Sequence, residues 1–295
     1  MKETYDICIL GAGASAFAVL SNLKPELKVC VIDSENEDVD VSELYRSEMT
    51  GSLTDFAQGY DMMRTRGWGG GLNCWGGQLW TLSNIDFQER EGIHDAWPIS
   101  LQDLIPYYKK AKAFLGDVDS VEVDIKHAEF NVRNSWYAHE SRHFYTKMTT
   151  DIIENNKNVT VVKNANVQKL NWNIDNNMRS ITSVLLRGID KWNKPEDSFE
   201  IKAGAYVLCC GCIENTKILL NSDLNHSSHV GKYLKDHLIC NVADVTYTSE
   251  SSMLYTESEP QKAFYFVPKQ TFLKKHDVPN FAVLCVSGNT YLNND

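Results

Sequence analysis

The start of the chain places two apolar runs on either side of a glycine-rich turn. Tyr5 to Leu10 and Lys28 to Ile32 are mostly apolar and have the length of buried strands. Between them, Gly11 to Ala16 predicts a tight turn, and Phe17 to Leu23 carries the apolar period of a helix. The pattern therefore predicts a βαβ unit, with Asp33 directly after its second strand.

Later segments continue the mixture of helices and strands, and we find no internal repeat. The apolar spacing predicts helices at 101–115, 146–155 and 214–221, the first beginning after Ser100 and ending at Gly116. It predicts strands at 158–163, 165–172, 180–187, 205–210, 240–248, 262–267 and 281–286. Asp175, Asn176 and Asn177 predict a turn before the strand at 180–187. This order of elements predicts an α/β fold with a β-rich region after residue 240.

Composition and charge narrow the class of protein. The 295 residues are 43% hydrophobic and 23% charged, as in ordinary globular proteins, so we expect a folded chain. The net charge of −10 argues against a nucleic-acid partner, because phosphate recognition needs a basic surface. The longest apolar run, Ala205 to Ile213, is too short to span a membrane, and the residues after Met1 do not resemble a signal peptide.

The eight cysteines do not indicate a secreted disulfide framework. Several lie in predicted core strands, where a free thiol behaves as a small apolar side chain. The densest group is Cys209-Cys210-Gly211-Cys212, and no second group of Cys or His lies at the spacing of a zinc site. We therefore expect a reduced, cytoplasmic protein with no metal ion.

The βαβ unit carries the pattern of a dinucleotide site. Gly11 permits the turn, Gly13 lets a pyrophosphate approach the backbone, and the small Ala16 allows close packing of helix and strand. Asp33 follows the second strand, where an acid accepts hydrogen bonds from ribose hydroxyls. A second strand–glycine unit, Tyr206 to Gly211, lies far downstream, which by analogy of fold favours FAD over a nicotinamide cofactor.

Four blocks in residues 5–238 follow the order of a known family. The first is the βαβ unit, and the second, Arg64 to Gly77, is similar to the segment Arg-x-Leu-Gly-Gly-Thr-Ser-x-x-Trp-Gly-Gly. The third block consists of Asp86 to Arg90, Trp97 to Ser100, Asp103-Leu104 and Pro106 to Tyr108. The fourth block consists of Cys210 to Leu220 and Val230 to His237. The chain thus resembles the glucose–methanol–choline (GMC) oxidoreductases, and its third block resembles the sugar-oxidising, pyranose oxidase-like branch.

The resemblance implies a Rossmann-like FAD-binding domain with a defined set of contacts. The adenosine diphosphate half would be held by Gly11, Gly13, Ala14, Ser15, Ala16 and Asp33. The flavin would lie along a segment that includes Arg66, Gly69, Gly70, Asn73, Cys74, Trp75 and Gly76. Gly211 would close over the pyrophosphate side, and Val167 would touch the adenine, although a plain core-strand role explains Val167 about as well.

Cys74 and the histidines depart from the family pattern. Some pyranose oxidase-like members bind flavin covalently through a histidine where this chain has Cys74. We expect noncovalent FAD, with a cysteinyl bond as the alternative. The family's proton acceptor is a histidine in a His-x-x-Gly-Thr block, a context that none of the eight histidines shares, so the catalytic residue is unknown. His237 resembles a structural Asp-His pair, while His139 and His143 fit surface positions.

The resemblance also implies a domain arrangement. We expect a discontinuous FAD-binding domain at 1–90 and 157–238, a helical insertion at 91–156, and a partial β-rich substrate domain at 239–295. The implied activity is FAD-dependent oxidation of a sugar, polyol or other alcohol, with the catalytic block absent from this chain through truncation at the C-terminus. The alternative is a non-catalytic flavin-binding module or one half of a split enzyme with a partner chain. A nicotinamide dehydrogenase is a weaker interpretation, because it leaves the segment 64–77 without a function.

Overall fold

The computed structural model groups the chain into two compact units. It describes residues 4–35, 66–74, 78–115, 122–123, 127–134, 136–137, 153, 155–189, 195–234, 242–243 and 264–284. The first unit comprises Met1–Gly76 and Glu140–Leu238, and the second comprises Gly77–His139 and Ile239–Asp295. The domain boundaries expected from the sequence stay a prediction.

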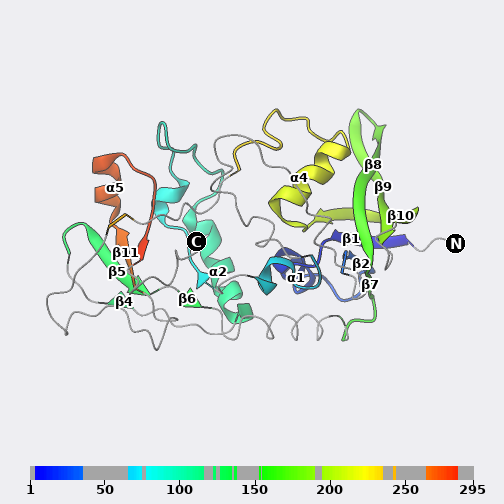
Figure 1. The fold of residues 1–295 in the computed structure, drawn as a ribbon, viewed down its shortest axis with the longest axis horizontal. Helices are drawn as coiled ribbons and strands as arrows, with labels where there is room; N and C mark the ends of the chain where they lie inside the picture. The colour runs from blue at the N-terminus through cyan, green and yellow to red at the C-terminus, as the bar shows by residue number, and fades with distance from the viewer. Residues whose placement is uncertain are drawn as a thin grey trace, which may run out of the picture. The chain divides into compact units, whose positions relative to one another are not determined.

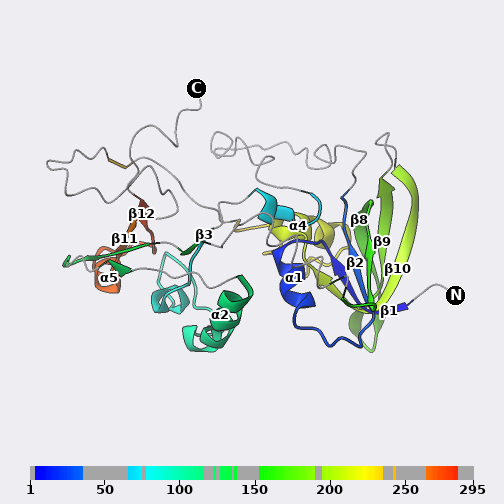
Figure 2. The same ribbon diagram turned by 90° about the horizontal axis from the view of Figure 1, so that it is seen from below.

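A six-stranded mixed sheet forms the framework of the first unit, with strand order β7-β2-β1-β10-β9-β8. The pairs β7–β2, β2–β1 and β1–β10 are parallel, whereas the pairs β10–β9 and β9–β8 are antiparallel. Figure 2 shows β8, β9 and β10 as long ribbons lying side by side. The strands are β1 (Thr4–Leu10), β2 (Val29–Ile32), β7 (Val159–Val162), β8 (Ala165–Asp175), β9 (Met178–Ile189) and β10 (Pro195–Leu208). The α/β fold class predicted from the sequence is therefore confirmed.

Strand β10 joins the parallel and antiparallel parts of this sheet. Its first half pairs with β9 from Pro195 to Ile201, and its second half pairs with β1 from Lys202 to Leu208. The sequence pattern predicted a strand only from residue 205, because the first half is rich in charged and polar residues. Pairing with β9 extends the strand, since partially exposed antiparallel strands tolerate polar side chains on one face.

A buried cluster of the first unit joins the sheet to helix α4. Cys8 and Leu10 of β1, Cys30 and Ile32 of β2, and Ile218 of helix α4 (Gly211–Asn221) pack in one buried cluster with side chains of β8 and β9. Figure 1 shows α4 beside β8. Alternate residues of β1 and β2 point to the opposite face and are also buried, so the parallel strands are covered on both sides. Cys8 and Cys30 thus occupy the core positions expected of free thiols.

Helix α1 (Ala14–Leu20) is shifted toward the N-terminus relative to the prediction, which placed the helix at Phe17 to Leu23. The glycine turn leads straight into the helix at Ala14. At the other end, the Ser21 hydroxyl and the Asn22 side-chain amide both donate to the Ala18 carbonyl, at 3.0 and 2.9 Å. These side chains occupy the acceptor that the next helical amide would need, which explains why the helix stops.

The hairpin that joins β8 to β9 turns at Asn176 and Asn177, as predicted. Both residues have positive φ, at 50° and 61°. Asparagine adopts this left-handed region more readily than most residues, and two such residues give a turn whose twist matches that of the strands.

Among its described residues, the second unit contains a four-stranded sheet, a two-stranded ribbon, two α-helices and a 3₁₀ helix (Asn84–Phe87). Helix α2 (Leu101–Leu115) matches the prediction, and Ser100 and Asp103 exchange hydrogen bonds at its start. The four-stranded sheet has the order β12-β11-β5-β4. The remaining elements are β3 (Gln78–Leu79), β4 (Glu122–Val123), β5 (Phe130–Asn134), β6 (Trp136–Tyr137), β11 (Phe264–Pro268), α5 (Gln270–His276) and β12 (Val283–Leu284).

Two features of the second unit were not predicted from the sequence. The segment expected to be a helical insertion, 91–156, contributes strands as well as α2, and its β5 pairs with β11 from the segment after residue 239. Helix α5 was not predicted, because it has only 7 residues and shows too little of an apolar period. The predicted helix at 146–155, apart from Ile153 and Asn155, and most of the predicted strand at 240–248 lie outside the described residues, as does Gly116. No helix among the described residues is long and apolar enough to cross a membrane.

Replacing Gly11 by alanine tests the tightest backbone approach in the first unit. Gly11 has φ +97°, and a Cβ there would lie 2.7 Å from the Cys209 carbonyl oxygen. We expect Gly11→Ala to lower the free energy of unfolding by at least about 2 kcal/mol. The control is Gly71→Ala, whose Cβ meets no described atom within 4 Å, and which should cost less than about 0.5 kcal/mol. Equal urea-unfolding midpoints for the two variants would contradict this interpretation.

Candidate nucleotide-binding site

Two strand-to-helix turns meet at the carboxyl ends of β1 and β10. The amide of Gly11 donates to the Ile32 carbonyl at 2.9 Å, and the amide of Cys209 donates to the Leu10 carbonyl at 2.7 Å. The absence of a side chain at Gly11 allows this approach of the Cys209 backbone. The βαβ turn and the turn before α4 therefore border the same region, at the sheet edge where α/β folds bind ligands.

The βαβ turn presents backbone to this region. Gly13 caps α1 in an extended conformation, with φ −92° and ψ −169°, and no side chain caps the helix. Ala14 and Ser15 are exposed, whereas Ala16 is fully buried against the sheet, as its small size predicted. The exposed first turn of α1 has the polarity that favours an anionic group.

Asp33 is buried at the end of β2, with 6% of its surface exposed. Its carboxylate accepts a hydrogen bond from the Glu35 amide at 2.7 Å and another from the Ala12 amide. Burial outweighs these bonds and raises the pKa of Asp33 to about 6. Glu35 is paired with Lys163 at 2.7 Å, so the second acid in this segment has its own counter-ion.

The described part of the glycine-rich segment, residues 66–74, lies against the βαβ turn. The amide of Gly69 donates to the Ala12 carbonyl at 2.9 Å, and Gly69 forms a parallel bridge with Gly13. The rings of Trp68 and Phe17 of α1 pack with centroids 5.7 Å apart. Gly69 has φ +94° and precedes a short 3₁₀ helix (Gly70–Asn73), so a residue with a side chain would be strained at Gly69.

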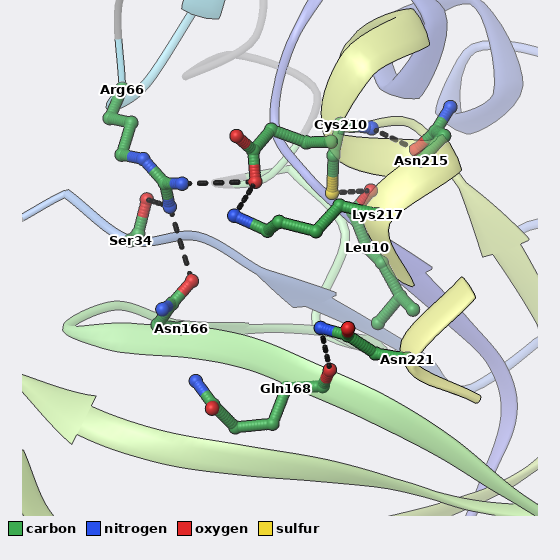
Figure 3. Close-up of polar contacts among 10 residues, drawn as sticks. Leu10, Ser34, Arg66, Asn166, Gln168, Cys210, Asn215, Lys217 and Asn221 are labelled. Atoms are coloured by element: carbon green, nitrogen blue, oxygen red, sulfur yellow. Dashed lines mark hydrogen bonds and ion pairs between the residues drawn. The ribbon is translucent and has the colours of Figure 1, made fainter. Parts of the chain in front are cut away.

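Arg66, at the beginning of this segment, forms an ion pair and hydrogen bonds with three other parts of the first unit (Figure 3). Its guanidinium is 3.1 Å from a carboxylate oxygen of Glu214 in α4 and donates to Asn166 of β8 at 3.1 Å. A longer bond, 3.5 Å, reaches the hydroxyl of Ser34 after β2. The Arg66 and Glu214 side chains are only 7% and 13% exposed. Glu214 also pairs with Lys217, one turn along α4.

The second glycine turn is held by Asn215 and by Cys210. The Asn215 side chain accepts from the Cys210 amide at 2.9 Å, and the Cys210 thiol contacts the Leu10 carbonyl at 3.0 Å. Burial raises the pKa of Cys210 to about 12, so this thiol stays protonated and unreactive near neutral pH. Gly211 has φ +82° and is exposed, and a Cβ there would meet no described atom within 4 Å.

The structure brings most of the residues that were predicted to contact FAD into this region. The turn residues Gly11 to Ala16, Asp33, the segment 66–74 and Gly211 are linked by the contacts above. Val167 lies on β8, half-buried, and follows Asn166, which binds Arg66. Trp75 and Gly76 lie outside the described residues. For all the residues named in this paragraph, contact with a cofactor stays a prediction.

Sequence reasoning did not assign roles to Ser34, Asn166 or Glu214. Glu214 lies in the fourth block quoted above, but nothing in its spacing shows that it faces Arg66, because the two residues are far apart in the chain. Each described histidine makes local contacts: His94 with Asp95, His127 with Phe130, His226 with Arg179, His229 with Tyr233, and His276 with Phe272. None of these contacts involves the candidate site, and the described residues contain no cluster able to hold a metal ion.

Comparison with known proteins gives a match to one family model and similarities to many solved structures, two of which are described here. Residues 131–239 match the family model described as GMC oxidoreductase. Pyridoxine 4-oxidase from Mesorbium loti is 17% identical with a TM-score of 0.49, over 74% of this chain and 52% of that one. THI4 from Thermovibrio ammonificans is 11% identical with a TM-score of 0.38, over 77% of this chain and 64% of that one. The chain thus spans less than two thirds of either structure, and no curated protein sequence matches it.

The raised pKa of Asp33 predicts a pH-dependent contribution to stability. The folded protein holds the Asp33 proton from the ordinary pKa of 3.8 up to about 6. The stabilisation is therefore complete below pH 4 and is lost as the pH rises through 6. Relative to Asp33→Asn, the free energy of unfolding of the ligand-free protein should fall by roughly 2 kcal/mol between pH 4 and pH 7. Urea unfolding of both proteins measures this difference, and parallel pH profiles would contradict the assignment.

Proposed function

We propose that this chain binds FAD and serves the flavin-dependent oxidation of an alcohol. The observation that carries the proposal is the position of the glycine-rich segment: Gly69 is bonded to Ala12 and bridged to Gly13, inside the βαβ turn. A dinucleotide held by that turn would have this segment beside it. A nicotinamide dehydrogenase would give the segment no comparable task.

The residues of the turn fit the adenosine diphosphate half of FAD. Asp33 offers a buried carboxylate to ribose hydroxyls, and Gly13 lets a pyrophosphate approach the start of α1. Around Gly71 and Gly211 the described residues leave space that a Cβ would enter without contact. FAD bound in this way would supply the hydride acceptor for the reaction, while the protein would orient it and exclude water.

The substrate part of the proposal rests on the family match at residues 131–239 and on the sequence resemblance. We propose a sugar, polyol or other alcohol as the substrate and a cytoplasmic location for the protein. No proton acceptor is assigned, because the described histidines contact other groups. The activity of a whole protein of this kind, including any partner chain, belongs to the proposal.

Titration with FAD and with NAD tests the cofactor. We expect the purified chain to bind FAD near stoichiometrically, with quenching of flavin fluorescence, and to bind NAD much more weakly. Asp33→Asn should weaken FAD binding about 10- to 100-fold at pH 8, since a charged acceptor of the ribose is lost. Asp6→Asn is the matched control, because the exposed Asp6 accepts from the Lys28 amide near the opposite end of β1. A chain that binds neither cofactor, or prefers NAD, would overturn the FAD assignment.

Anaerobic mixing of the FAD-loaded chain with alcohols tests the reaction. Sugars and polyols that are substrates should bleach the oxidised-flavin absorbance, and matched deoxy compounds should not. If FAD binds but no alcohol bleaches it, the chain acts as a flavin-binding module without oxidising alcohols itself. Loss of a general base typically lowers such rates about 10²- to 10⁴-fold, so bleaching should be followed over hours as well as seconds.

A further inference from the structure

We propose that Glu214 is a positioning residue for the flavin. Through its ion pair with Arg66, Glu214 holds the segment 66–74 in the place that FAD requires, without touching FAD itself. This inference rests on the proposed function and adds a residue that neither the sequence pattern nor the family match assigns to the site.

The pair is well suited to hold a loop. The Arg66 guanidinium lies 3.1 Å from Glu214, and both side chains are almost fully buried. A buried pair of this kind has strict geometry, because each charge loses its hydration and depends on its partner. If the carboxylate of Glu214 is lost, the Arg66 guanidinium loses this charged contact, whereas its contacts with Asn166 and Ser34 are with neutral acceptors. The start of the loop would then be held less tightly.

The pair also joins elements on two sides of the loop. Gly69 and Trp68 attach the loop to the turn before α1 and to α1 itself. Arg66 attaches the same loop to the first turn of α4, which follows the second glycine turn. Figure 3 shows Arg66 approaching Ser34 and Asn166 from a separate segment. The loop is therefore held at its start by a charge pair, and further along by the Gly69 backbone and the Trp68 ring.

This arrangement separates the two halves of FAD. The contacts proposed for the adenosine diphosphate half come from Gly11 to Ala16 and from Asp33, none of which bonds to Glu214. The contacts proposed for the flavin come from the loop. Loss of the Arg66–Glu214 contact should therefore weaken the binding of the flavin and leave the binding of adenosine diphosphate unchanged.

The experiment compares FAD with ADP on the full chain. Dissociation constants for both ligands are measured by calorimetry, and the visible circular dichroism of bound flavin reports its orientation. Glu214→Gln should raise the dissociation constant for FAD about tenfold or more, change that for ADP less than about threefold, and alter the flavin dichroism. A role in overall stability alone would weaken FAD and ADP equally and leave the dichroism of bound flavin unchanged.

Lys217→Met is the matched control. Lys217 is 43% exposed and pairs with the same carboxylate, so its removal leaves the Arg66–Glu214 contact in place. We expect less than about a twofold change for either ligand, because the Lys217 ammonium stays partly hydrated in this pair. If Glu214→Gln fails to fold, Arg66→Lys keeps the charge but loses the planar fork, and should still weaken FAD more than ADP.

The outcomes distinguish this inference from the proposed function. A wild-type chain that binds neither FAD nor ADP refutes the proposed function. A wild-type chain that binds both, with variants that weaken both equally or neither, refutes the role of Glu214 alone. An effect of Lys217→Met as large as that of Glu214→Gln would also refute it, because the helix charge rather than the contact with Arg66 would then be responsible.

Discussion

The parallel pairing of β1 with β10 is the constraint on which the rest of the site depends. It brings the end of a strand near residue 208 beside the end of the first strand, and it needs Gly11 because the Cys209 carbonyl occupies the place of a Cβ. Once these strand ends meet, α4 starts beside the βαβ turn. Glu214 in the first turn of α4 can then reach Arg66, and the glycine-rich segment is held between the two turns.

Two buried acids in this unit are stabilised in different ways. Glu214 is paired with the charges of Arg66 and Lys217. Asp33 is held mainly by backbone amides, and burial raises its pKa to about 6. A carboxylate in that condition gains from extra donors, which ribose hydroxyls would supply. The contrast explains why one acid fits a structural role and the other a ligand contact.

The local sequence predicted the structure correctly where a single residue type or a single apolar period is compatible with only one kind of element. The apolar run of β1, the glycine turn, the Asn176–Asn177 turn and helix α2 were all found from it. It failed where tertiary contacts decide. The first half of β10 is polar and becomes a strand only by pairing with β9. Helix α1 stops early because two side chains take the Ala18 carbonyl, and α5 is too short to show a period.

By itself, the sequence determined the βαβ unit, the acid that follows it and the resemblance to a flavoprotein family. These features are local, since a turn needs its glycine and a strand needs its apolar run within a few residues. The tertiary structure decided which distant segments meet. Arg66, Asn166 and Glu214 come from three separate parts of the chain, and only packing of the sheet and α4 places their charges and amides within hydrogen-bond distance. No spacing in the sequence encodes that contact, because it depends on how the whole unit folds.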